Sequence, residues 1–92
     1  MQPMPKRIAL PNKETASLIE RADQHLAKFQ IEEAIELYNN AVQYMVGLYG
    51  GMSDEIAAVH HKIASVYYKL GDFDTAIMCE RSSLELLEAL YG

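Results

Sequence analysis

The chain of 92 residues has few of the residue types that several classes of protein require. Its single cysteine, Cys79, excludes a disulfide bond within the chain and fits a reducing compartment, so we expect a cytoplasmic location. Lysine and arginine total 8 against 13 aspartates and glutamates, and no stretch concentrates the basic residues. Because nucleic-acid binding depends on neutralising phosphates, the net charge of −5 argues against a nucleic-acid partner.

Long apolar runs and internal prolines are also missing. No stretch approaches the roughly 20 apolar residues that a membrane-spanning helix needs, so we expect no membrane span. Lys6 and Arg7 are not followed by the apolar segment of a signal peptide. The prolines all lie before Asn12, and each removes an amide donor and restricts the residue before it. We therefore predict an extended arm over residues 1–11 and a helical domain over residues 12–92.

Side chains that could carry catalysis do not form a recognisable pattern. His60 and His61 are adjacent, so on a helix they point about 100° apart and cannot bind one metal ion together. Cys79 has no base beside it in the sequence, and the chain has no glycine-rich phosphate loop. We expect no metal site, no cofactor and no catalytic residues, and hence a protein that is not an enzyme.

The second half of the chain contains apolar residues at helical spacing. Those of residues 56–70 recur at three- and four-residue steps, which places them on one helical face. Gly71 and Asp72 interrupt this pattern, because glycine tolerates a left-handed helix end and aspartate can cap the next helix. A second apolar stripe follows, made of Phe73, Ala76, Ile77, Leu84, Leu87 and Leu90. The sequence predicts two helices around one sharp turn.

The first half gives the same prediction. Asn12 is a suitable first cap, and a helix is expected to run from there to about Lys28. Its inward-facing residues should be Leu18, Ile19, Ala22, Leu26 and Phe29. A further helix is expected from about Glu32 to Gly50.

The two halves of the chain align with each other when Ala22 is placed on Ala64, a shift that we call the repeat offset. The pair Ala34-Ile35 then meets Ala76-Ile77, and Leu48-Tyr49-Gly50 meets Leu90-Tyr91-Gly92. A fixed period of this size is typical of stacked helical repeats. We therefore predict an all-α fold of two antiparallel helix hairpins, stacked as a fragment of an α-solenoid. Repeat one should cover residues 12–50 and repeat two residues 53–92.

These hairpins resemble tetratricopeptide repeats (TPRs). In repeat two the resemblance is carried by His60, Ile63-Ala64, Tyr67, Gly71-Asp72-Phe73 and Ala76, and in repeat one by Leu18, Ala22, Ala34, Tyr38 and Ala41. The usual TPR period is 34 residues. The period here, which runs from Ala22 to Ala64, is longer and adds about two helical turns. Long repeats that end in Leu-Tyr-Gly are similar to those of clustered-mitochondria (Clu) proteins and of kinesin light chain.

The resemblance implies a protein–protein interaction module, an adaptor or scaffold that binds a partner peptide or helix in a concave groove. The groove positions are Ile19, Asp23 and Leu26 in repeat one, and Ala58, His61, Ser65, Tyr68 and Lys69 in repeat two. The likeness to Clu proteins implies a role in mitochondrial distribution, and the likeness to kinesin light chain implies a cargo adaptor. A purely structural segment of a longer solenoid is the alternative.

The last predicted helix carries more apolar residues than packing on one neighbouring helix should bury. They are Leu84, Leu86, Leu87, Leu90 and Tyr91. Exposed apolar surface of this kind marks association sites. We therefore expect a homo-oligomer, most simply a two-fold symmetric dimer through this helix.

Overall fold

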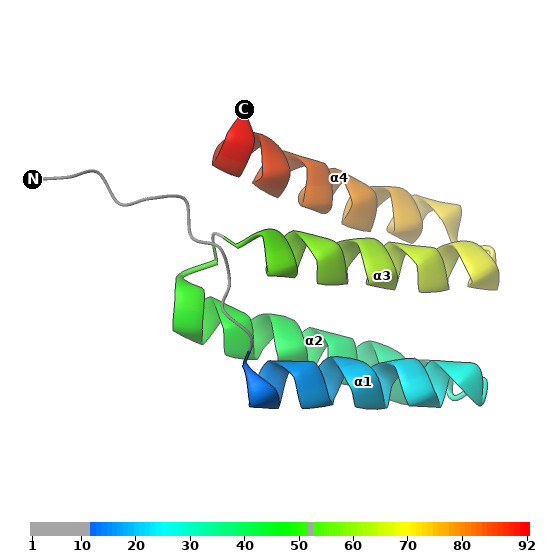
Figure 1. The fold of residues 1–92 in the computed structure, drawn as a ribbon. Coiled ribbons are helices and arrows are strands. Elements are labelled where there is room, and N and C mark those ends of the chain that lie inside the picture. The colour runs from blue at the N-terminus through cyan, green and yellow to red at the C-terminus, as the bar shows by residue number, and fades with distance from the viewer. Residues whose placement is uncertain (1–11, 52) are drawn as a thin grey trace, which may run out of the picture.

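The computed structural model describes residues 12–51 and 53–92, and these form four α-helices. The helices are α1 (Lys13–Ala27), α2 (Ile31–Tyr49), α3 (Asp54–Leu70) and α4 (Phe73–Tyr91), shown in Figure 1. No strand occurs in the described ranges, and none of the helices there is long and apolar enough to cross a membrane. The predicted all-α fold is confirmed, while the predicted arm over residues 1–11 lies outside the described residues.

Three of the four helices begin at a side chain that caps them. Asn12 accepts a hydrogen bond from the Thr15 amide at 3.0 Å, and Ser53 accepts one from the Glu55 amide at 3.1 Å. Asp72 does the same for α4, accepting from the amide three residues later at 3.2 Å. These bonds satisfy amides that have no partner within the helix, which fixes where each helix starts.

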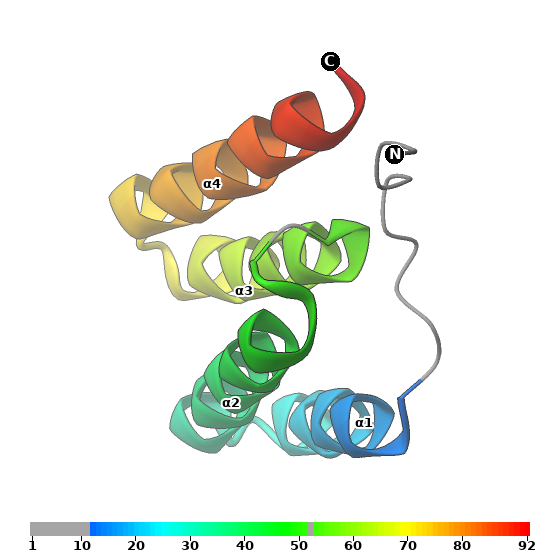
Figure 2. The ribbon, with the colours of Figure 1, turned by 90° about the vertical axis from the view of Figure 1, so that its left-hand side faces the viewer.

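The helices pack as two hairpins, α1 on α2 and α3 on α4, joined by contacts between α2 and α3. Viewed along the helices in Figure 2, α1 and α3 lie on one side and α2 and α4 on the other. One buried cluster connects the first three helices, and it contains Ala22, Ala34, Tyr38, Ala41, Val42, Met45, Ile56, Val59, Ile63 and Val66. Both α2 and α3 pack against two neighbouring helices, so they are the inner helices of the described part of the chain.

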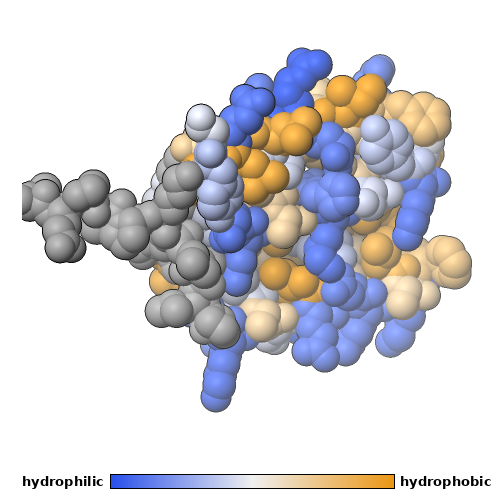
Figure 3. Space-filling view, turned by 45° about the horizontal axis from the view of Figure 1, so that its top comes forward, coloured by the Kyte–Doolittle hydropathy of each residue, from blue (hydrophilic) through white to orange (hydrophobic). Residues whose placement is uncertain are grey.

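By contrast, α4 buries only a narrow stripe, because within the described part of the chain it packs mainly against α3. Its buried residues are Ala76, Ser83 and Leu90, spaced seven apart, and the Ser83 hydroxyl donates to the Ala57 carbonyl at 2.9 Å. Of the predicted apolar stripe, Phe73, Ile77 and Leu84 are about half exposed or more, so only part of this stripe is buried. On the side of the molecule seen in Figure 3, orange apolar side chains reach the surface between blue polar ones.

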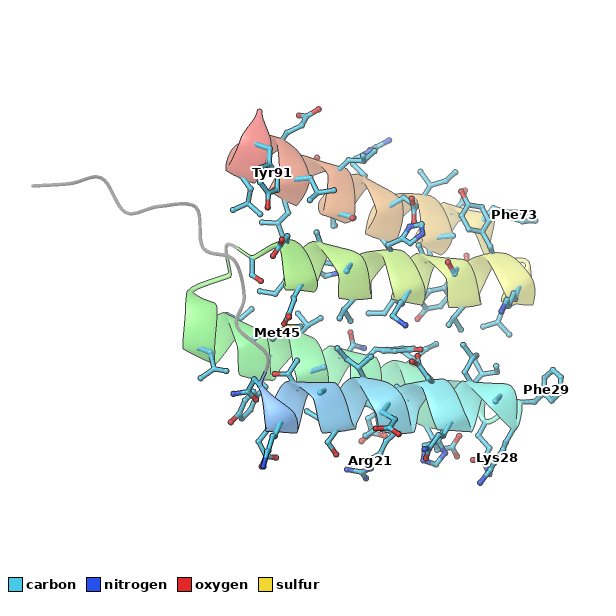
Figure 4. All side chains as sticks on the ribbon, viewed as in Figure 1. Arg21, Lys28, Phe29, Met45, Phe73 and Tyr91 are labelled. Atoms are coloured by element: carbon cyan, nitrogen blue, oxygen red, sulfur yellow. The ribbon has the colours of Figure 1, made fainter. Side chains whose placement is uncertain are left out.

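The two hairpin turns share one backbone geometry. Phe29 and Gly71, which the repeat offset places on each other, both adopt left-handed angles, with φ of 61° and 81°. Each amide donates at 3.0 Å to a carbonyl three residues earlier, on Leu26 and Tyr68. The prediction that Phe29 packs inward is wrong, because this residue follows the end of α1 and its ring points into solvent, 87% exposed (Figure 4).

Candidate partner-binding groove

A groove of about 430 Å³ lies between α1 and α3, the first helices of the two hairpins. Ala16 and Ala58 occupy equivalent positions in the two repeats, and both line it. Their small side chains leave the space open, while Ile19 and Val59 supply apolar surface. The full lining is Asn12, Thr15, Ala16, Ile19, Glu20, Asp23, Glu55, Ala58, Val59 and Lys62. An apolar hollow with a few polar groups at its edge is the usual form of a binding site.

Asp23 connects three helices at one end of this groove. The buried Tyr38 hydroxyl of α2 donates to Asp23 Oδ1, and the Lys62 ammonium of α3 donates to both carboxylate oxygens at 3.3 and 3.4 Å. Burial raises the pKa of Tyr38 far above its ordinary value, and the neighbouring Asp23 carboxylate adds to the effect. Tyr38 therefore stays a neutral donor, and Asp23 links α1 to both α2 and α3.

The charge around the groove is predominantly negative. Glu20, Asp23 and Glu55 line it, against the single cation Lys62, which Asp23 already engages. Burial raises the pKa of Glu55, and the adjacent Asp54 charge raises it further. A positively charged group placed beside these carboxylates would be stabilised, and a second carboxylate would be repelled.

One buried hydroxyl on the groove wall has no partner among the described residues. Thr15 is 2% exposed, and its Oγ1 makes no hydrogen bond there. Leaving such a group unsatisfied costs about 1–3 kcal/mol.

The positions predicted for partner binding do not all lie in the groove between α1 and α3. Ile19, Asp23 and Ala58 line the groove between α1 and α3. His61 instead faces α4, where its Nδ1 lies 2.6 Å from Glu80 Oε1. It lines a second hollow of about 330 Å³, together with Asp54, Ala57, Ala58, Glu80, Ser83, Leu84 and Leu87. Leu26 is half-buried and packs against the core.

The remaining predicted positions lie on α3 towards its C-terminal end. The Ser65 hydroxyl donates to the His61 carbonyl at 3.1 Å, and the Tyr68 ring lies 6.0 Å from the ring of Phe73. Lys69 is exposed. None of the three lines the groove between α1 and α3.

The groove residues that sequence reasoning missed include Thr15, Glu20, Glu55 and Lys62. A signal for two of them was present, because Glu55, Ala58 and Lys62 are spaced by three and four residues and so share one face of α3.

The set predicted for self-association is only partly exposed. Leu84 and Tyr91 are exposed, and the Tyr91 hydroxyl donates to Asp54 at 3.2 Å. Leu87 is half-buried, and Leu86 packs against the core cluster. Leu90 is only 6% exposed, so its side chain serves the packing of α4 on α3 and is not available to a second copy. The homo-oligomer itself stays a prediction.

His60 and Cys79 lie on the other side of the molecule, in a shallow hollow with Ile63 and Tyr67. Burial raises the pKa of the Cys79 thiol and the Glu80 charge raises it further, so the thiol stays protonated and poorly nucleophilic. Within residues 12–51 and 53–92, no three His, Cys, Asp or Glu side chains are grouped to hold a metal ion.

Burial also lowers the pKa of His60 below its ordinary 6.5, which gives a testable pH dependence. The unfolded chain then takes up a proton at a higher pH than the folded chain does. The stability contributed by His60 should be complete above about pH 6.5 and decrease as the pH falls below that value. We expect proton NMR to give a His60 pKa below 6.5, and His60→Gln to reduce the loss of stability between pH 7 and 5.5. A titration at or above 6.5 would contradict this assignment.

Comparison with known proteins gives one match. The model of the tetratricopeptide repeat family matches residues 14–89, which covers both hairpins. No curated protein and no solved structure matches the chain significantly. The narrower resemblance to Clu proteins or kinesin light chain is not shown by this match. With four helices in two equivalent hairpins and a family match over most of its length, the chain belongs to the tetratricopeptide repeat family.

Proposed function

We propose that this TPR chain is a protein–protein interaction module whose groove between α1 and α3 binds a segment of a partner protein. The observation that supports the groove is its construction: an apolar wall at Ala16, Ile19 and Ala58, with the carboxylates of Asp23 and Glu55 beside it. The wall can bury apolar side chains of a partner, and the carboxylates can pair with a basic side chain next to them.

The partner segment should be apolar and basic. Glu20, Asp23 and Glu55 surround the groove, so lysine or arginine next to an inserted apolar residue would meet opposite charge. For the same reason the groove should reject a free C-terminal carboxylate, which Asp23 and its neighbours would repel.

The narrower parts of the proposal depend on the long period of the internal repeat. They are a cytoplasmic adaptor similar to Clu proteins, with a role in mitochondrial distribution, or a cargo adaptor similar to kinesin light chain. The groove chemistry supports partner binding in either case and does not distinguish them.

Calorimetric titration with matched peptides tests the groove. The first probe is a capped peptide with two leucines flanked by lysines, and the second carries glutamates in place of the lysines. We expect saturable binding of the first, at least ten-fold weaker binding of the second, and none of an acidic peptide with a free C-terminus.

Ala58→Arg should fill the groove and weaken binding of the basic peptide at least ten-fold. Ala89→Arg is the matched control, because Ala89 is exposed on α4 and the substitution changes the net charge equally. Equal affinity for both leucine peptides, or normal binding by Ala58→Arg, would refute the groove assignment.

A structural role is the second candidate, and the exposed apolar residues of α4 favour it. In this role α4 is covered by a further helix, which either a second copy of the chain or another protein would supply. If a second copy of the chain supplies this helix, the result is a homo-oligomer.

A further inference from the structure

The turn between α1 and α2 carries an aromatic ring that the fold does not use. Phe29 is 87% exposed, and its ring projects from the end of the molecule in Figure 4. The repeat offset places Gly71 at the same point of the second hairpin. Glycine adopts the left-handed angle found at both turns freely, whereas a residue with a Cβ is strained there. Phe29 therefore destabilises its turn and buries little of its ring in this chain.

A cation lies next to this ring. Lys28 is exposed, and both Lys28 and Phe29 project away from the helices where α1 ends (Figure 4). Lys28 forms no ion pair with any residue that the structure describes. At the second turn the equivalent pair is Leu70 and Gly71, which lacks both the cation and the ring. We call Lys28 and Phe29 the first tip, a basic residue beside an exposed apolar one.

The groove between α1 and α3 has the complementary chemistry. The small side chains of Ala16 and Ala58 leave its apolar wall open. Asp23 already pairs with a lysine, but Glu20 and Glu55 are in no ion pair within the described ranges. An aromatic ring that enters an apolar hollow buries about 150–250 Å² of surface. A cation beside the ring would then meet the carboxylates at the edge.

The first tip does not reach the groove of its own copy. Phe29 follows the C-terminal end of α1, whereas the α1 residues that line the groove run from Thr15 to Asp23. The ring points away from this stretch (Figure 4). A groove on a second copy is open to it. Because tip and groove are different surfaces, such a contact joins copies head to tail and leaves one tip and one groove free at the ends.

We propose that the first tip of one copy inserts into the groove between α1 and α3 of a second copy. The Phe29 ring covers the apolar wall, and the Lys28 ammonium pairs with the Glu20 or Glu55 carboxylate. This inference rests on the proposed function, since it uses the same groove, and it adds an occupant that the chain itself supplies. A partner protein must displace this occupant, so by mass action partner binding weakens as the concentration of the chain rises.

Sedimentation equilibrium of the whole chain tests the contact. Copies of net charge −5 repel one another at long range, so the buffer contains about 0.15 M salt, where charges are screened beyond about 8 Å. We expect reversible association at several hundred micromolar. Phe29→Gly should weaken it at least ten-fold and yet melt at a higher temperature, because the strained turn is relieved. Lys28→Glu should weaken association several-fold.

Two variants serve as matched controls and should associate normally. Arg81→Glu changes the net charge as Lys28→Glu does, at an exposed position on α4. Leu70→Ala removes an apolar side chain that is 53% exposed at the second turn.

A mixing experiment shows whether two different surfaces meet. Ala58→Arg fills the groove and keeps the first tip, whereas Phe29→Gly removes the ring and keeps the groove. Neither variant should associate alone, but an equal mixture should form a one-to-one heterodimer that cannot extend. Circular dichroism should show equal helix content for the two variants.

The proposal is overturned if the unchanged chain is a monomer at several hundred micromolar, if Phe29→Gly associates as the unchanged chain does, or if mixing yields no heterodimer. Association that Leu84→Glu abolishes and Phe29→Gly does not would place the contact on α4 instead. The basic leucine peptide separates this failure from failure of the proposed function. If Phe29→Gly binds that peptide, the groove still accepts a partner segment; if it does not, the proposed function fails as well.

Discussion

Met45→Ala should lower the free energy of unfolding by about 2–5 kcal/mol, the range found when a large buried side chain is removed. Met45 is completely buried in the cluster that joins α2 to α3, so the cavity would open between the two hairpins (Figure 4). A domain of this size has about 5–14 kcal/mol of stability in total, so the loss is a large part of it. Urea unfolding followed by circular dichroism measures the change.

Val46→Ala is the control for this substitution. Val46 is the next residue along α2 and is 40% exposed, so its truncation should cost less than about 1 kcal/mol. Similar losses for the two variants would mean that the α2–α3 contact is not a well-packed core.

Leu90→Glu and Leu84→Glu should differ sharply, although both place a carboxylate on α4. Leu90 is 6% exposed against α3, and a charge there must either be buried or pull the end of α4 away. We expect Leu90→Glu to cost about 2–4 kcal/mol and Leu84→Glu, at an exposed position, about 0.5 kcal/mol or less. Thermal melts with matched protein concentrations give both values.

This comparison also bears on self-association. A variant that unfolds the end of α4 would lose any dimer for trivial reasons, so only an exposed residue such as Leu84 can test an interface there. If Leu90→Glu proved as stable as Leu84→Glu, the packing of α4 described above would be wrong.

Helix positions could be predicted well because local chemistry determines them. Asn12, Ser53 and Asp72 cap the helices from within their own first turns, and Gly71 ends α3 by its left-handed angle. The internal repeat then gives the pairing of helices, since equivalent segments must make equivalent contacts.

Which side of α4 packs against α3 could not be predicted in the same way. Its apolar residues cover more than half of the helix circumference, and the pattern alone does not say which side meets α3. The structure resolves this through small residues: Ala76 and Ser83 are buried where the two helices approach closely, leaving the larger Ile77 and Leu84 outside. Similarly, the groove depends on how α1 and α3 cross, so Thr15 and Glu20 join it through tertiary geometry.

The shared turn geometry at Phe29 and Gly71 has a consequence for the order of folding. A left-handed angle costs an ordinary residue about 1–2 kcal/mol more than it costs glycine, so closing the first hairpin is intrinsically less favourable than closing the second. The second hairpin should therefore form early and present Ile56, Val59 and Ile63 as a ready surface. The first hairpin then closes while α2 settles on that surface, and the contact between hairpins compensates for the strained turn. Folding of this chain would in that case run from its C-terminal half towards its N-terminal half.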